Sequence, residues 1–256
     1  MGKTIRIFLT LCMAIAIVAA YYVSNRNKQI ERLYSEGAGY PPLFRGPKES
    51  REAVKKLATY PGRRSTNMLL NIALGHNVLV AEAQIDAMKA LRERRDPEVA
   101  NVLASRLQPF EGLATRQAVT ETLQNLPCKD ECIHYILHYL ERVWRGEKNY
   151  EDETIFPPGS ENWKADQQKS QQDLYAGLYS ILQREKVETL ASLAGIYGLG
   201  SDDPSPFSLD LLSHIGLHEA CPYLSQSKKL IEERSPDFYK GPRHELQATI
   251  ESLNCE

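Results

Sequence analysis

The sequence predicts an all-α fold: a right-handed α-solenoid of antiparallel helix pairs that follows one N-terminal transmembrane helix. Three observations favour this fold. The chain begins with an uncharged apolar run, its other apolar residues recur at helical spacing, and a helix–turn–helix pattern repeats. With 256 residues, 42% hydrophobic and 25% charged, the chain has an ordinary globular composition and enough length for a sizeable core.

Residues 7–23, IFLTLCMAIAIVAAYYV, carry no charge and hold Tyr21 and Tyr22 near their C-terminal end, where interfacial tyrosines are expected. As a helix they span about 26 Å, close to the hydrocarbon core of about 30 Å. We therefore expect residues 1–24 to be a single-pass membrane anchor. The alternative is a signal peptide cleaved after Ala20, which would leave a secreted or periplasmic soluble protein.

A linker is expected over residues 25–48, where glycine and proline cluster after a polar stretch. The folded part is expected to begin near Glu49. From there, apolar residues follow a helical period, as in Ile85, Met88 and Leu91. Breakers divide the chain into helices of about 10 to 17 residues, which predicts helical repeats over 49–145.

A second set of helices is expected over 166–256, resuming at Gln167. Ser205 is the predicted N-cap of one of these helices, with Pro206 in its first turn. The last helix, 244–253, carries Leu246, Ile250 and Leu253 on one face, which suits a helix that caps a helical array.

The repeat is clearest in three segments, 90–103, 122–137 and 211–224. In each, a leucine ends the first helix, a glutamate precedes the small residue that opens the second, and an aliphatic residue follows. The four positions are Leu91, Glu98, Val99 and Leu103 in the first segment, Leu123, Glu131, Cys132 and Ile136 in the second, and Leu212, Glu219, Ala220 and Leu224 in the third. One helix pair cannot bury its apolar face alone, so we expect the pairs to stack and to bury Leu91 and Leu103.

This pattern resembles the HEAT-repeat family, in particular its short phycobilisome-lyase-like repeats, whose turn is similar to residues 215–220. The resemblance covers residues 49–145 and 186–224. The middle copy departs from it by one or two extra residues in its turn. The resemblance implies an armadillo-like helical solenoid that binds proteins. In some relatives it implies assistance in chromophore attachment, so that an enzyme or enzyme-assembly factor is the alternative function.

The helical period stops over residues 146–165, which are acidic and hold the aromatic residues Tyr150, Phe156 and Trp163. Long irregular segments are commonly functional or disordered. These three residues are the predicted binding residues, because aromatic side chains are favoured at binding hot spots. The alternative is a surface insertion that folds back on the helices.

Four cysteines lie outside the apolar segment: Cys128, Cys132, Cys221 and Cys255. An even number predicts two disulfides in an oxidising compartment, most simply Cys128–Cys132 and Cys221–Cys255. The alternative is four reduced thiols in a cytosolic core. Because basic residues flank the apolar segment about equally, cysteine use decides the expected topology, with the bulk of the chain extracytoplasmic.

Functional chemistry is sparse in this sequence. The net charge of −2 gives no basic surface for nucleic acid. His134 and His138 follow two cysteines, but they lie on the exposed flank of their predicted helix, away from Cys132, so no metal site is expected. No catalytic or phosphate-binding motif occurs in the folded region. We therefore expect a membrane-anchored scaffold or adaptor for protein partners, without catalysis and without a cofactor.

Overall fold

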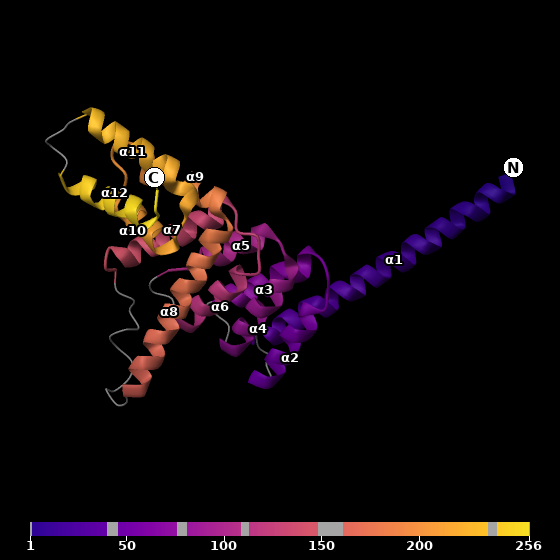
Figure 1. Cartoon of the computed structure of the whole chain (residues 1–256). Coiled ribbons are helices and arrows are strands. Elements are labelled where there is room, and N and C mark those ends of the chain that lie inside the picture. The colour runs from indigo at the N-terminus through magenta and orange to yellow at the C-terminus, as the bar shows by residue number, and fades with distance from the viewer. Residues whose placement is uncertain are drawn as a thin grey trace. The chain divides into compact units, whose positions relative to one another are not determined.

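The computed structural model describes residues 2–39, 46–75, 81–108, 113–147, 161–234 and 240–255, and their side chains except those of 2–12, 14, 81, 114, 161–168, 234 and 240–243. The described residues form twelve α-helices and two short 3-10 helices, and none of them lies in a strand (Figure 1). The predicted all-α class is therefore confirmed. The chain divides into two compact units, residues 1–91 and 92–256, and this division falls inside the repeat region predicted over 49–145.

The described residues of the first unit form four helices, in which α1 packs on α2 and α3, and α2 and α3 both pack on α4. These helices are α1 (Gly2–Gly37), α2 (Pro47–Ala58), α3 (Arg63–Leu74) and α4 (Ala81–Leu91). Each helix thus contacts its neighbour and its next-but-one neighbour along the chain, which is the packing expected of stacked helix pairs.

The helix α1 differs from the expected anchor and linker. It continues without a break through residues 25–37, the first part of the predicted linker. Residue Ile30 and, just after the helix, Ala38 are buried, and the Ser50 hydroxyl donates to the Glu36 carbonyl across 2.6 Å. The glycines and prolines that indicated a linker begin only at Gly37, so residues 25–36 contain no breaker and continue the helix.

Among the residues whose side chains the structure describes, no helix combines the length and the apolar character that crossing a membrane requires. Residues 7–12 and 14 of the predicted anchor lie outside that set.

In the second unit the described ranges form eight α-helices, which again pack on near neighbours in the sequence. Helices two apart are in contact, namely α5 with α7, α6 with α8, α7 with α9, α8 with α10 and α10 with α12. Sequential contacts join α5 to α6, α8 to α9, α9 to α10 and α11 to α12. Their bounds are α5 (Pro97–Ala104), α6 (Leu113–Leu123), α7 (Asp130–Trp144), α8 (Glu161–Arg184), α9 (Lys186–Tyr197), α10 (Pro206–Ile215), α11 (Cys221–Arg234) and α12 (Lys240–Ser252).

The repeat predicted from the sequence is visible in the burial of its members. The leucine and aliphatic positions of all three segments are fully buried, and so are the small residues between them. The three glutamates are exposed. Two of them accept bonds from an earlier helix, Glu131 from Asn101 across 3.1 Å and Glu219 from Lys186. The expected burial of Leu91 and Leu103 is confirmed.

Some helix ends differ from the prediction. The helix α8 begins at Glu161, before the expected start at Gln167, and with 24 residues it exceeds the expected length. Ser205 occupies the predicted N-cap position of α10 with Pro206 in the first turn, but its side chain makes no capping bond. Instead, the Ser208 hydroxyl donates back to the Ser205 carbonyl across 2.7 Å.

Candidate functional site

The two predicted cysteine pairs lie at disulfide distance. The Cα atoms are 5.2 Å apart in Cys128–Cys132 and 5.4 Å apart in Cys221–Cys255, within the usual range for a disulfide. The first pair joins the α6–α7 turn to the first turn of α7, and both of its residues are fully buried. The second joins the start of α11 to the end of the chain. The predicted pairing thus agrees with the geometry of the fold.

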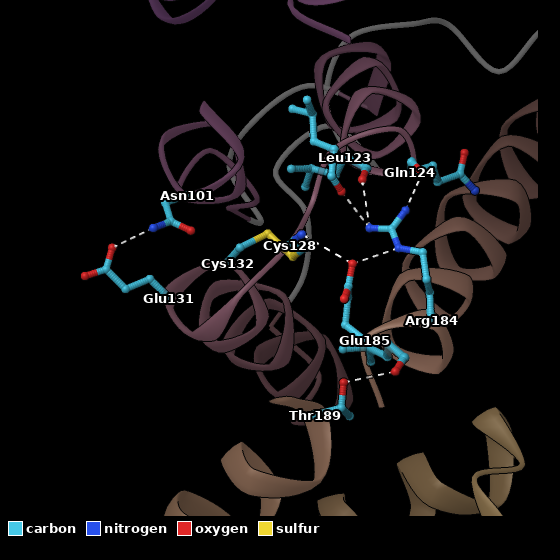
Figure 2. The surroundings of a disulfide bond; sticks show 11 residues. Asn101, Leu123, Gln124, Cys128, Glu131, Cys132, Arg184, Glu185 and Thr189 are labelled. Carbon is cyan, nitrogen blue, oxygen red and sulfur yellow. Dashed lines mark hydrogen bonds and ion pairs between the residues drawn. A yellow bond between two sulfur atoms is a disulfide. The ribbon is translucent and has the colours of Figure 1, made fainter. Parts of the chain in front are cut away.

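The Cys128–Cys132 pair lies in a set of polar contacts centred on Arg184, the last residue of α8 (Figure 2). The guanidinium of Arg184 donates to the Gln124 carbonyl and, across 2.7 Å, to the Leu126 carbonyl. The adjacent Glu185 accepts from the Arg184 guanidinium across 2.8 Å and from the Cys128 amide across 3.4 Å. Because these carbonyls follow the last turn of α6, Arg184 supplies the donors that the helix end lacks. These contacts stabilise the fold, and the cysteines are too buried to react with a substrate.

The predicted binding residues are Tyr150, Phe156 and Trp163. Tyr150 and Phe156 lie outside the described residues. Trp163 belongs to the first turn of α8 rather than to an irregular segment, and its side chain also lies outside the described set. These three residues therefore stay predictions.

A different aromatic residue is exposed next to that segment. Trp144 ends α7 with 48% of its surface exposed, which is unusual for so large an apolar side chain. Its ring lies 6.1 Å from that of Phe207, edge to face, and Phe207 in turn lies 5.1 Å from the Tyr197 ring. Aromatic pairs at such distances attract one another. Trp144 thus packs against Phe207, which belongs to a buried aromatic pair with Tyr197.

Two adjoining hollows flank Trp144, of about 240 Å³ and about 150 Å³, and both are also bordered by Asp210. We call them together the Trp144 groove. The larger is lined by Trp144, Pro206, Leu209, Asp210, Ser213, Glu245, Ala248 and Thr249, and the smaller by Leu140, Val143, Trp144, Tyr175, Tyr179, Phe207, Asp210, Leu211 and His214. Helices α7, α8, α10 and α12 therefore contribute to one concave, partly aromatic surface.

The groove carries negative charge at its edge. Asp210 and Glu245 line the larger hollow, and neither makes an ion pair with a described lysine or arginine. The His214 ring lies beside Asp210, with Nδ1 at 3.7 Å from a carboxylate oxygen. Burial and the negative charge of Asp210 both raise the pKa of Tyr179, which keeps that phenol neutral. The groove thus combines an aromatic floor with two carboxylates.

A larger hollow, of about 340 Å³, lies between α11 and α12, lined by Lys228, Ile231, Glu232, Leu246 and Gln247. The Lys228 ammonium donates to the Gln247 side chain across 3.2 Å and so connects its two walls. Its described lining contains no aromatic anchor, which makes the Trp144 groove the better candidate site.

Sequence reasoning did not single out Trp144, although a signal for it exists. Ile133, Ile136, Leu137 and Leu140 form the buried stripe of α7, and Trp144 extends that stripe by one turn beyond Leu140. Because this apolar stripe continues to the last residue of the helix, it predicts that the aromatic side chain of Trp144 lies at the edge of the core.

The remaining predicted residues give no site. His134 and His138 are exposed as expected, with ring centroids 6.4 Å apart. Within the described ranges, no cluster of three or more His, Cys, Asp or Glu side chains is arranged to hold a metal ion.

Comparison of the chain with models of known protein families, with characterised proteins and with solved structures gives no match.

Proposed function

We propose that this protein is a membrane-anchored adaptor of the helical-solenoid type, which binds a partner protein at the Trp144 groove and acts without catalysis. The observation that carries the proposal is the half-exposed Trp144 between two hollows. Tryptophan is among the residues most enriched at binding hot spots, and its indole gives a large rigid contact at little entropic cost.

The solenoid assignment, of the HEAT-like kind, is supported by the packing of helices on their next-but-one neighbours in each unit. It is also supported by the burial of Leu91, Leu123 and Leu212, which the sequence pattern places at corresponding positions of the repeat. Stacked helix pairs commonly present extended concave surfaces for binding.

The anchor and the location rest on two further observations. Residues 7–23 are uncharged and long enough as a helix to cross most of a bilayer. Two cysteine pairs at disulfide distance favour an oxidising compartment for the rest of the chain. We infer a single-pass protein whose folded part lies outside the cytoplasm.

The chemistry of the groove favours a basic side chain of the partner. A lysine or arginine inserted beside Trp144 would place its cation near the indole face, an attraction that is strongest for tryptophan. Asp210 and Glu245 would balance that charge from the same hollow. The hollow of about 240 Å³ is smaller than the 300–1,000 Å³ typical of small-molecule sites, so it suits one side chain of a partner protein.

The test uses the full chain in lipid nanodiscs with Trp163→Phe, which leaves Trp144 as the single tryptophan. The probe is a short peptide with one central arginine, and the matched probe carries neutral citrulline in its place. We expect the arginine peptide to change Trp144 fluorescence and to bind about tenfold more tightly than the citrulline peptide.

Asp210→Asn together with Glu245→Gln should abolish that preference, because both substitutions keep the shape and remove the charge. The control is Asp173→Asn together with Glu251→Gln, which removes two exposed carboxylates that do not line the groove. Equal affinity for the two peptides, or an equal effect of the two variant pairs, would refute the groove as a site for a basic partner.

The anchor is tested separately by alkaline carbonate extraction of membranes from cells that express the full chain. We expect the intact chain to stay in the membrane pellet and its four downstream cysteines to react with an alkylating reagent only after reduction. A soluble chain beginning at Tyr21 would replace the anchor by a cleaved signal peptide, and freely alkylated cysteines would place the fold in the cytoplasm.

A further inference from the structure

The turn between α2 and α3 is attached to α1 close to the end of its apolar stretch. The Arg26 guanidinium donates to the Pro61 carbonyl across 2.7 Å and lies 6.0 Å from the centroid of the Tyr60 ring. The Tyr60 hydroxyl donates to the Gln29 side chain across 2.9 Å. Two residues beyond Gln29, Glu31 pairs with Arg64. Side chains of α1 therefore fix this turn at the level of residues 26–31.

The opposite end of α2 is attached much further along α1. The Ser50 hydroxyl, in the first turn of α2, donates to the carbonyls of Glu36 and Gly37 across 2.6 Å and 3.1 Å. Helix α2 therefore runs antiparallel to α1 and returns the chain toward the apolar stretch. In Figure 1, the N-terminal part of α1 extends well beyond α2 and α3.

The helical rise converts these attachments into distances along α1. Because α1 is continuous, Arg26 lies about 5 Å beyond Val23, whereas Gly37 lies about 21 Å beyond it. The headgroup layer of a bilayer is about 5–7 Å thick on each side of the hydrocarbon core. A helix tilt of about 20° shortens these distances by less than a tenth.

We propose that the α2–α3 turn, residues 60–63, is a second membrane contact that lies among the phosphate groups of the lipid headgroups. This inference rests on the anchoring of residues 7–23 given under the proposed function. With that stretch in the hydrocarbon core, Arg26 lies in the headgroup layer, and its bond to Pro61 holds the turn at the same depth.

The residues of the turn suit that environment. Pro61, Gly62 and Arg63 are exposed. Tyrosine is enriched at membrane interfaces, where its ring lies near the acyl boundary and its hydroxyl remains solvated. The guanidinium of Arg63 is a strong donor to phosphate oxygens. A second contact beside the anchor would limit how far the first unit tilts relative to the bilayer.

The experiment measures the depth of the two ends of α2 in the full chain. In a Cys12→Ser background, Pro61→Cys and Pro47→Cys each provide one free thiol for an environment-sensitive fluorophore. Pro47 is the matched control, because it is also an exposed proline but stands at the other end of α2. The labelled proteins are placed in phosphatidylcholine–phosphatidylglycerol nanodiscs that contain a lipid with a nitroxide on its headgroup.

We expect the nitroxide to quench the label at position 61 about threefold or more above the label at position 47, given the difference of about 16 Å in distance from the apolar stretch. Arg63→Cys is a second probe of the turn, in case Pro61→Cys impairs folding, and circular dichroism melting checks each variant. Equal quenching at both ends of α2, with the chain still in the membrane after carbonate extraction, would overturn this inference alone. Release of the chain by carbonate would overturn the anchor and, with it, this inference.

Discussion

The guanidinium of Arg184 donates to the backbone carbonyl of Leu126, 2.7 Å away in the turn between α6 and α7. The same side chain reaches the Leu123 and Gln124 carbonyls, so the end of α8 provides the donors that complete the end of α6 (Figure 2). A neighbouring side chain, Gln183, donates in the same way to the Ile215 carbonyl at the end of α10. The last turn of α8 thus hydrogen-bonds to the C-terminal ends of both α6 and α10.

Arg184→Met should lower the free energy of unfolding by about 2 kcal/mol, since hydrogen bonds from a charged donor contribute about 1.5–3 kcal/mol and the carbonyls would lose their partner. Arg145→Met is the matched control, because Arg145 pairs with Glu141 on one helix face and is 65% exposed, where such pairs contribute about 0.5 kcal/mol or less. Urea denaturation measures the loss of unfolding free energy in each variant. Similar losses for the two variants would contradict the role given to Arg184.

Two helical glycines should respond to alanine with opposite signs. A Cβ at Gly177 in α8 would lie 2.7 Å from the Thr120 Cγ2 on α6, whereas a Cβ at Gly195 in α9 meets nothing within 4 Å. Gly177→Ala should therefore destabilise the protein by about 1–3 kcal/mol through overpacking. Gly195→Ala should stabilise it by about 0.5–1 kcal/mol, because alanine loses less entropy in a helix. Thermal melting of both variants tests the close approach of α6 and α8.

The two disulfides should differ in what they contribute to stability. They close loops with sequence separations of 4 for Cys128–Cys132 and 34 for Cys221–Cys255. On the chain-entropy model these loops correspond to about 2 kcal/mol and about 4 kcal/mol. Replacing both cysteines of a pair by alanine should therefore cost more for Cys221–Cys255, measured as the change in unfolding free energy without reductant. The reverse order would exclude loop closure as the main source of the effect.

Stability should fall at alkaline pH through the buried phenols. Burial, followed by the charge of Glu141, raises the pKa of Tyr197 well above its usual value. A raised folded-state pKa contributes stability that is fully present below the unfolded value of about 10 and is lost as the pH rises above it. Tyr197→Phe should be less stable than the parent at pH 8, because it loses the 3.1 Å bond to Glu141. The difference in unfolding free energy between the two proteins should narrow between pH 10 and 12. If the two curves of unfolding free energy against pH stay parallel, the raised pKa of Tyr197 is contradicted.

The sequence predicted the helical class because apolar spacing determines it. The predicted burial pattern of the repeat agrees with the structure at Leu103, Ile136 and Leu224. It did not predict the continuation of α1 past residue 24, because a polar helix face and a linker have similar composition. Whether residues 25–37 pack depends on tertiary partners such as Ser50, which no local pattern shows.

The same limitation applies to the candidate site. Residue type favours an exposed position for Arg116, yet its side chain is only 1% exposed and bonds to the Tyr139 hydroxyl across 2.8 Å. The Trp144 groove forms where four helices meet, so its lining is scattered over more than a hundred residues of the chain. Spacing within one helix places Trp144 at the edge of the core, but the hollows around it form only where α8, α10 and α12 meet α7.

The bond between Cys221 and Cys255 also has a mechanical consequence. Because it closes residues 221–255 into a covalent ring, tension applied to the last residue passes directly to the start of α11. Helix α12 and most of α11 then bear no load. The chain inside the ring cannot extend, which shortens the fully stretched protein by about 115 Å, at about 3.5 Å per residue. In a pulling experiment, adding reductant should lengthen the final extension by that amount, so this disulfide determines how far the C-terminal end can be drawn out.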